Sequence, residues 1–344
     1  MNIQELIRPS IKKLKPYSSA RDEFQDSNDD LIFFDANENP FDNGLNRYPD
    51  PQQKELKALI SSQKQISADT ILLGNGSDEI LDLLIRVFCE PNKDKLIILP
   101  PTYGMYEVLA NVNAVEVVKI PLSETFDLHV DEILDLKNRG CKILFLCSPN
   151  NPTGKNFNKN AIESLIKDFV GIVVIDEAYI DFSKDESWLS RLLEFPNLVI
   201  TQTLSKAYGL AGIRLGICFA SKEIISVLNR IKPPYNVNQL TQQTAITSLK
   251  SIDKINTEIN IIIEERTKLF YSFKELNFVQ NVYPTDANFI LVKVDDANKR
   301  YRQLVDNGII VRNRTNELLC ENCLRITVGT PKENQKLISV LKSL

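Results

Sequence analysis

The sequence predicts an α/β fold with a mostly parallel central sheet that helices cover on both faces, followed by a smaller α+β domain. From Asp69 onward, short apolar runs alternate with segments of helical periodicity, which is the pattern of βαβ units. The runs are apolar at every position, as in strands that are buried on both sides. A change of pattern after Pro233-Pro234 predicts the second domain.

The elements of the large domain follow in chain order. Apolar runs predict strands at 71–73, 96–99, 142–147, 172–175, 198–203 and 213–220. Segments of helical periodicity lie between several of them, at 77–88, 103–111 and 159–169. Each helix connects two strands, so the pairing should be mostly parallel.

The C-terminal third predicts a different arrangement. Residues 252–276 form one long amphipathic helix, and a terminal helix starts at Pro331. Shorter strands are expected at 288–294, 309–312 and 324–328. Because a prolyl pair cannot continue a helix, we place the border at this pair, with a large domain at 31–232 and a small one at 233–344. Residues 1–30 have too few apolar positions for their own core and should form an arm that packs on the small domain.

Composition excludes several classes of function. With 41 Lys and Arg against 45 Asp and Glu, the net charge is −4, which lacks the basic excess of nucleic-acid-binding proteins. No apolar run is long enough to span a membrane, and we expect a cytoplasmic protein. The single histidine, His129, sits in a polar connection, and Cys320 and Cys323 have no second cysteine pair or histidine near them. We therefore expect no metal site and no disulfide scaffold.

The strongest local signal for chemistry is the segment that runs from Thr203 to Arg214. Lys206 follows a buried strand, next to Ser205 and ahead of a glycine-rich turn. Loss of solvent lowers the pKa of a lysine, which makes it a nucleophile for carbonyl carbons. Arg214 lies beyond the glycines and could reach a phosphate held near this lysine.

Other strands place polar side chains at the same edge of the sheet, where α/β proteins bind ligands. Asp176 ends one apolar run and could keep a pyridine nitrogen protonated, while Tyr179 could donate to a phenolate on that ring. Asn151 lies in the turn that follows another strand. A glycine-rich turn leads into Ser77 and Asp78 at a helix start, which is suited to phosphate. Since the dinucleotide and P-loop signatures are absent, a small phosphorylated cofactor is favoured.

These parts together describe a pyridoxal phosphate site, in which Lys206 holds the cofactor covalently and Asp176 pairs with its ring nitrogen. The remaining side chains would contact its phenolate or its phosphate end: Asn151, Tyr179, Ser77, Asp78, Thr203, Ser205 and Arg214. Asn-Asn-Pro-Thr-Gly, Asp-Glu-Ala-Tyr and Ser-Lys, with an arginine downstream, occur in an order that resembles the fold-type-I aminotransferases. The resemblance covers essentially the whole chain.

Four further segments resemble the histidinol-phosphate aminotransferase family more closely: residues 35–40, 47–50, 101–106 and 323–330. The resemblance implies a homodimer that acts in histidine biosynthesis. It would exchange an amino group between histidinol phosphate and 2-oxoglutarate, giving imidazole acetol phosphate and glutamate.

The resemblance also implies roles for individual residues. Tyr48 would reach the cofactor phosphate of the neighbouring subunit, Tyr103 would stack on the pyridine ring, and Arg325 would bind the substrate anion. Further substrate contacts would come from Tyr17, Asn37, Asn151 and Arg312.

Three alternatives remain open at this point. An aromatic or other amino-acid aminotransferase and a threonine-phosphate decarboxylase would keep the same cofactor residues and differ only in the substrate pocket. A pyridoxal-phosphate-binding regulator without turnover is disfavoured, because the chain has no helix-turn-helix pattern and no basic excess.

Overall fold

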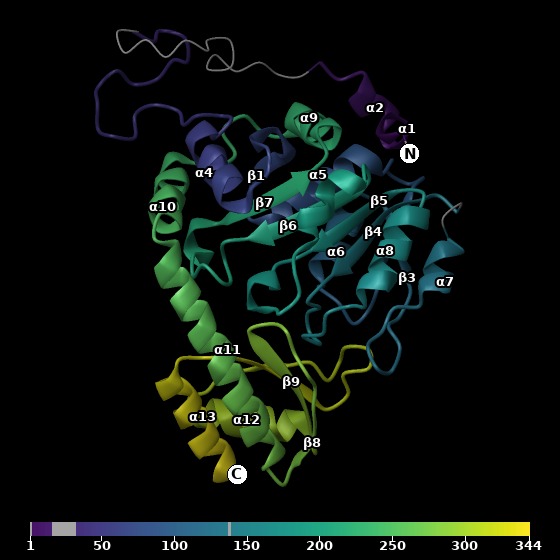
Figure 1. Ribbon diagram of the computed structural model, residues 1–344, viewed down its shortest axis with the longest axis vertical. Coiled ribbons are helices and arrows are strands. Elements are labelled where there is room, and N and C mark those ends of the chain that lie inside the picture. The colour runs from purple at the N-terminus through teal and green to yellow at the C-terminus, as the bar shows by residue number, and fades with distance from the viewer. Residues whose placement is uncertain (1, 16–31, 137–138) are drawn as a thin grey trace.

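The computed structural model describes residues 2–15, 32–136 and 139–344 (Figure 1). The large domain is built on a seven-stranded sheet with the strand order β1-β7-β6-β5-β4-β2-β3. Its strands are β1 (Ile71–Asn75), β2 (Lys95–Ile98), β3 (Glu116–Lys119), β4 (Cys141–Cys147), β5 (Ile172–Asp176), β6 (Leu198–Thr203) and β7 (Leu215–Ala220). β7 is antiparallel to both of its neighbours, and the other pairs are parallel. The carboxyl ends of β1, β4, β5 and β6 therefore lie at one edge.

Helices cover both faces of this sheet. One face packs against α5 (Ser77–Phe88), α6 (Met105–Val112) and α9 (Lys222–Ile231), and the other against α4 (Lys54–Lys64) and α8 (Lys159–Asp168). Successive residues of a strand point into opposite cores. Leu72 belongs to the core beneath α5, α6 and α9, and Leu73 belongs to the core beneath α4 and α8. Each buried aliphatic side chain of this size stabilises the fold by about 1.5–3 kcal/mol. The predicted two-sided α/β sheet is confirmed.

The small domain contains a four-stranded antiparallel sheet of order β10-β11-β9-β8. Its strands are β8 (Val279–Val282), β9 (Phe289–Val294), β10 (Arg312–Asn313) and β11 (Cys323–Thr327). The long helix α11 (Ile252–Lys274) and the helices α12 (Ala297–Asp306) and α13 (Pro331–Lys342) pack on this sheet. α13 begins with a capping box between Thr330 and Glu333, which satisfies free N–H groups of its first turn.

The domain border differs from the expected one. After Pro233-Pro234 the chain continues into α10 (Gln239–Leu249), which lies beside α4 (Figure 1). Ala245 and Leu249 are buried in the core of the large domain, and the side chain of Gln63 donates to the Leu249 carbonyl. The border therefore falls between α10 and α11, because the apolar face of α10 is buried on the large domain.

The N-terminal arm also lies elsewhere than expected. Its helices α1 (Ile3–Leu6) and α2 (Pro9–Lys12) lie next to the large domain. Ile3 and Ile7 are buried in the core beside α5, and the Arg8 amide donates to the Val87 carbonyl over 2.9 Å. The expectation of packing on the small domain is wrong for the described part of the arm, and residues 16–30 lie outside the described residues.

The structure describes every cysteine of the chain and its single histidine. All six cysteines are buried as free thiols, and His129 is exposed at the start of α7 (Val130–Leu134). Within the described ranges, no helix combines the length and the apolar content needed to cross a bilayer.

Candidate active site

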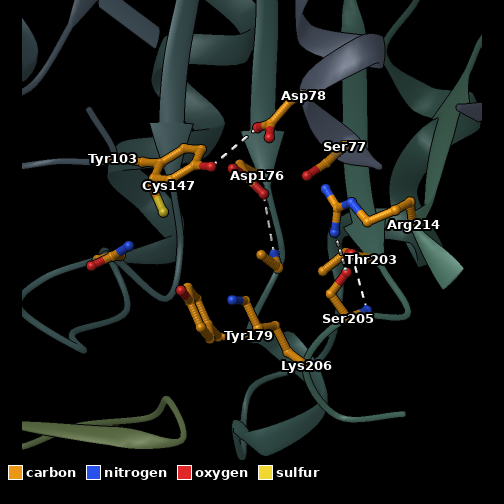
Figure 2. Close-up of a pocket in the computed structure, with 12 residues that line it drawn as sticks. Ser77, Asp78, Tyr103, Cys147, Asp176, Tyr179, Thr203, Ser205, Lys206 and Arg214 are labelled. Atoms are coloured by element: carbon orange, nitrogen blue, oxygen red, sulfur yellow. Dashed lines mark hydrogen bonds between the residues drawn. The ribbon is translucent and has the colours of Figure 1, made fainter. Parts of the chain in front are cut away.

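A pocket of about 150 Å³ opens at the edge where β4, β5 and β6 end (Figure 2). Its lining comes from segments that are far apart in the sequence: Ser77, Asp78, Tyr103, Cys147, Asn151, Asp176, Ala178, Tyr179, Thr203, Ser205, Lys206 and Arg214. The topology explains the assembly, since the ends of these strands share one edge of the sheet. Of these residues, only Cys147 and Ala178 had no predicted role.

Asp176 is the last residue of β5 and is 3% exposed. Its Oδ2 accepts a hydrogen bond of 2.7 Å from the Tyr106 hydroxyl, and its Oδ1 accepts one of 3.2 Å from the Ala178 amide. Burial raises the pKa of Asp176 above its ordinary value, and these hydrogen bonds oppose the rise because they favour the ionised form. The carboxylate keeps lone pairs free for a donor in the pocket.

Lys206 follows β6 in a tight turn, and its Nζ lies 5.8 Å from the centre of the Tyr179 ring. The residue is exposed toward the open pocket, yet the surrounding walls remove much of the solvent from its amine. This desolvation lowers the pKa of Lys206, and the positive charge of Arg325 lowers it further. The neutral, nucleophilic amine is thereby favoured.

The opposite end of the pocket is built to receive an anion. α5 starts at Ser77 without a side-chain cap, so its first N–H groups are free. The Arg214 guanidinium lies beside this terminus and donates to the Ser205 hydroxyl over 3.4 Å. Close packing requires glycine here, since a Cβ on Gly76 would lie 2.7 Å from Arg214 Nη2 and one on Gly216 would lie 2.4 Å from Ser77 N. Free amides, a hydroxyl and a guanidinium together suit a phosphate group.

The remaining wall is formed by amide and aromatic side chains. The Tyr103 hydroxyl donates to Asp78 over 3.1 Å, and burial raises the pKa of Tyr103, so this phenol stays protonated. From β11 of the small domain, Arg325 Nη1 donates to Asn151 Oδ1 over 2.5 Å. This contact joins the two domains next to the pocket, so an anion bound by Arg325 would lie close to Lys206.

Among the described residues, four predicted site residues do not line this pocket: Asn37, Tyr48, Arg312 and Arg325. Asn37 and Tyr48 are in an exposed segment before α4, where Tyr48 is 50% exposed and its ring stacks on Tyr235 at 4.4 Å. Arg312 is exposed on β10, where it pairs with Arg325 across the strands. Tyr17 lies outside the described residues. A single copy of the chain thus brings together the predicted cofactor residues except Tyr48.

Tyr106 adjoins the pocket and has no role among the site residues predicted above. It is fully buried on α6 and stacks on Phe145 at 4.7 Å. In the expected helix at 103–111, a spacing of three residues would put the Tyr103 and Tyr106 rings on one face, which was the available signal, whereas the observed α6 begins at Met105. That signal was weak, because aromatic side chains at helical spacing usually belong to the core.

Comparisons with known proteins agree with this geometry. The sequence matches the family described as aminotransferase class I and II over residues 32–341. A histidinol-phosphate aminotransferase of Flavobacterium johnsoniae is 62% identical over 344 residues, covering 100% of this chain and 99% of that protein. One from Flavobacterium psychrophilum is 57% identical over 343 residues, covering 100% and 99%.

Solved structures show the same architecture. A histidinol-phosphate aminotransferase from Clostridium acetobutylicum matches with a TM-score of 0.80 and 28% identity, covering 87% of this chain and 90% of that one. The enzyme from Sinorhizobium meliloti, solved in complex with pyridoxal-5'-phosphate, shares the fold with a TM-score of 0.78 and 21% identity, covering 86% and 82%.

Proposed function

The chain belongs to the class I and II aminotransferase family, and from this premise we propose that it is a pyridoxal-phosphate-dependent histidinol-phosphate transaminase. It would exchange the amino group of L-histidinol phosphate with 2-oxoglutarate, giving imidazole acetol phosphate and L-glutamate in histidine biosynthesis. The observation that carries the proposal is the arrangement of Lys206, Asp176 and Arg214, which point into one pocket from three segments (Figure 2).

The residues of the pocket fit pyridoxal phosphate. Arg214, Ser205 and the free amides of α5 would hold its phosphate, Asp176 would pair with its ring nitrogen, and Lys206 would bond to its aldehyde carbon. Asn151 and Tyr179 would contact its phenolate oxygen, and Tyr103 would lie against its ring. When bound, the cofactor supplies an electron sink for the carbanion that forms at the substrate Cα.

The chain's own residues would perform two tasks in the reaction. Asp176, as a buried anion, would hold the proton on the ring nitrogen and so keep the electron sink strong. Lys206, once freed from the cofactor, would be an amine of lowered pKa. It would take the proton from the substrate Cα and give it to C4′ of the cofactor.

The anion pocket supports a substrate that carries either a phosphate or a second carboxylate. Histidinol phosphate has a phosphate and no carboxylate, whereas glutamate has two carboxylates. An arginine pairs with either group bidentately, so Arg325 could serve both substrates. Arg312, opposite Arg325 in the β10–β11 pair, would add positive charge at the outer end.

We expect the enzyme to be a cytoplasmic homodimer with shared active sites. Tyr48 lies in an exposed segment outside the pocket of its own chain, which supports a role in the site of the neighbouring subunit.

Half-reactions of the purified holoenzyme test the proposal. Histidinol phosphate should convert the cofactor to its amine form, which is followed by the change in its absorption band, and 2-oxoglutarate should restore the original band. An equal response to phenylalanine would favour the aromatic aminotransferase, and release of CO₂ from threonine phosphate would favour the decarboxylase. Absence of any cofactor band after incubation with pyridoxal phosphate would contradict the cofactor assignment itself.

A further inference from the structure

Tyr106 lies directly behind the pocket and has no role in the function proposed above. Its side chain is 0% exposed, and its hydroxyl donates to Asp176 Oδ2 over 2.7 Å. The hydrogen bond joins α6 to the end of β5, between two residues that are far apart in the sequence. Tyr106 does not line the pocket itself, but it contacts three residues that do: Asp176, Cys147 and Tyr103.

Packing fixes the position of the Tyr106 ring. It stacks on Phe145 of β4 with a centroid distance of 4.7 Å and an interplanar angle of 4°. On another side, Tyr103 meets it edge to face at 5.5 Å and 86°. Because both neighbours restrict the ring, its hydroxyl oxygen is held next to Asp176 Oδ2, to which it donates, with the Cys147 thiol as a second polar neighbour.

The proton of this hydrogen bond belongs to the tyrosine. Burial raises the pKa of Tyr106 well above its ordinary value, and the negative charge of Asp176 raises it further. Tyr106 is therefore protonated at neutral pH and acts as a neutral donor. A neutral donor stabilises an ionised acceptor more than a protonated one.

Asp176 needs this stabilisation, because its surroundings otherwise favour the protonated acid. Burial raises its pKa, and the negative charge of Asp78 adds to the rise. The Ala178 amide opposes it from 3.2 Å, and the Thr201 hydroxyl lies opposite Asp176 on β6. The ionisable groups around the carboxylate are Tyr103, Tyr106, Cys147, Asp78, Tyr179 and Lys206. The cations that line the pocket with Asp176 are Lys206 and Arg214, and the bond from Tyr106 is shorter than the one from the Ala178 amide.

We propose that Tyr106 is a positioning residue that keeps Asp176 anionic and turns its free lone pairs toward the ring nitrogen of the cofactor. This inference rests on the proposed function and adds to it a residue that sets the protonation of that nitrogen. The Tyr106 bond occupies one lone pair of Oδ2, so the carboxylate keeps other lone pairs that could accept the ring N–H.

The test uses Tyr106→Phe holoenzyme reconstituted with pyridoxal phosphate labelled with nitrogen-15 in the ring. The substitution removes one hydroxyl and keeps the stack on Phe145. We expect the ring-nitrogen signal to move from the protonated toward the unprotonated position. kcat should fall about 10- to 100-fold, as expected for loss of a hydrogen bond to a charged group, with less than a threefold change in KM.

A second pair of variants separates positioning from packing. In an Asp176→Asn background, Tyr106→Phe should change kcat less than twofold, because its target is gone. Phe145→Leu, which loosens the stack and keeps the hydroxyl, should move the nitrogen signal less than Tyr106→Phe does. An unchanged nitrogen signal in Tyr106→Phe, or an equal fall of kcat in both backgrounds, would overturn the proposal.

Two further outcomes remain informative. If Tyr106→Phe does not fold, 4-aminophenylalanine at position 106 gives a weaker donor of nearly the same shape, and the nitrogen signal must then move toward the unprotonated position or the proposal fails. If the wild-type protein binds no pyridoxal phosphate, the proposed function fails before Tyr106 is tested, so the two failures are distinguishable.

Discussion

The predicted site residues come from two regions that the chain builds in opposite ways. At the carboxyl ends of β4, β5 and β6, polar side chains are enclosed and bond to one another, as Asp176 does with Tyr106. In the segment at 32–49, which carries Asn37 and Tyr48, large apolar side chains face outward: Phe34 is 93% exposed and Phe41 is 81% exposed. A single chain therefore encloses the side chains of the first region, whereas the apolar side chains of the second region stay uncovered.

The exposed segment has a defined shape in spite of its exposure. The Glu38 carboxylate accepts hydrogen bonds of 2.7 Å from the Tyr48 amide and from Arg47. Asn39, Asp42 and Asn43 each accept a hydrogen bond from an amide two residues later, at 2.8–3.0 Å. The polar groups of the segment thus form hydrogen bonds with one another, whereas its large apolar side chains stay exposed. Such an arrangement is typical of a surface that a second protein molecule covers.

The largest effect is expected from the enclosed region. Lys206→Ala should abolish turnover, because no other lysine among the described residues lines the pocket. The cofactor should still bind without a covalent bond, since Asp176 and Arg214 remain. Borohydride reduction of the wild-type holoenzyme, followed by peptide mapping, should place the pyridoxyl group on Lys206. Label on a different lysine would contradict the assignment.

Asp176→Asn should lower kcat by about a hundredfold to a thousandfold and weaken cofactor binding much less. An amide cannot hold the pyridinium proton, so the loss falls mainly on the transition state. The measurement compares kcat with the dissociation constant of pyridoxal phosphate. A nearly normal kcat would show that Asp176 is not the partner of the ring nitrogen.

A third prediction tests the exposed region without touching the pocket. Phe34→Asp combined with Phe41→Asp should convert a dimer into monomers and lower activity about tenfold or more, because a charge at the centre of an apolar interface is strongly unfavourable. Sedimentation velocity measures the mass, and thermal unfolding checks that the fold persists.

The matched control is Val112→Asp, which changes an apolar side chain of α6 that is 72% exposed. The mass of this variant in solution and its activity should match those of the wild-type protein. If the double variant remains as large and as active as this control, the segment at 32–49 is not an interface.

The same contrast explains what the sequence could predict. The strand ends were predictable because apolar runs mark parallel strands, and parallel strands bring their carboxyl ends together whatever lies between them. α5 was predicted with its observed bounds, since its apolar residues recur at helical spacing. β3 was not predicted, because it has four residues and charged ends.

The remaining errors have tertiary causes. Tyr106 was not recognised because its chemistry lies in one hydroxyl on an otherwise apolar face. The domain border was placed too early, because Pro233-Pro234 marks a local break in the chain and cannot report which core α10 joins. Any contact of Tyr48 with a neighbouring subunit could not be derived from the structure of a single chain.

The smallest of the expected effects on activity comes from Tyr48→Phe, and it is the most direct test of sharing between subunits. Loss of one hydrogen bond to the cofactor phosphate should weaken cofactor binding about tenfold to a hundredfold. In its own chain, the Tyr48 ring stacks on Tyr235, and phenylalanine preserves that stack. Any effect therefore comes from the hydroxyl.

Mixing Tyr48→Phe subunits with Lys206→Ala subunits decides which pocket that hydroxyl serves. If Tyr48 acts in the neighbouring subunit, each mixed dimer has one site with both changes and one site with neither. That second site should show wild-type cofactor affinity, so activity at limiting pyridoxal phosphate rises above the average of the two parents. If Tyr48 acts within its own subunit, each mixed dimer has one Tyr48→Phe site and one inactive site, no wild-type site forms, and the activity of the mixture stays at the average.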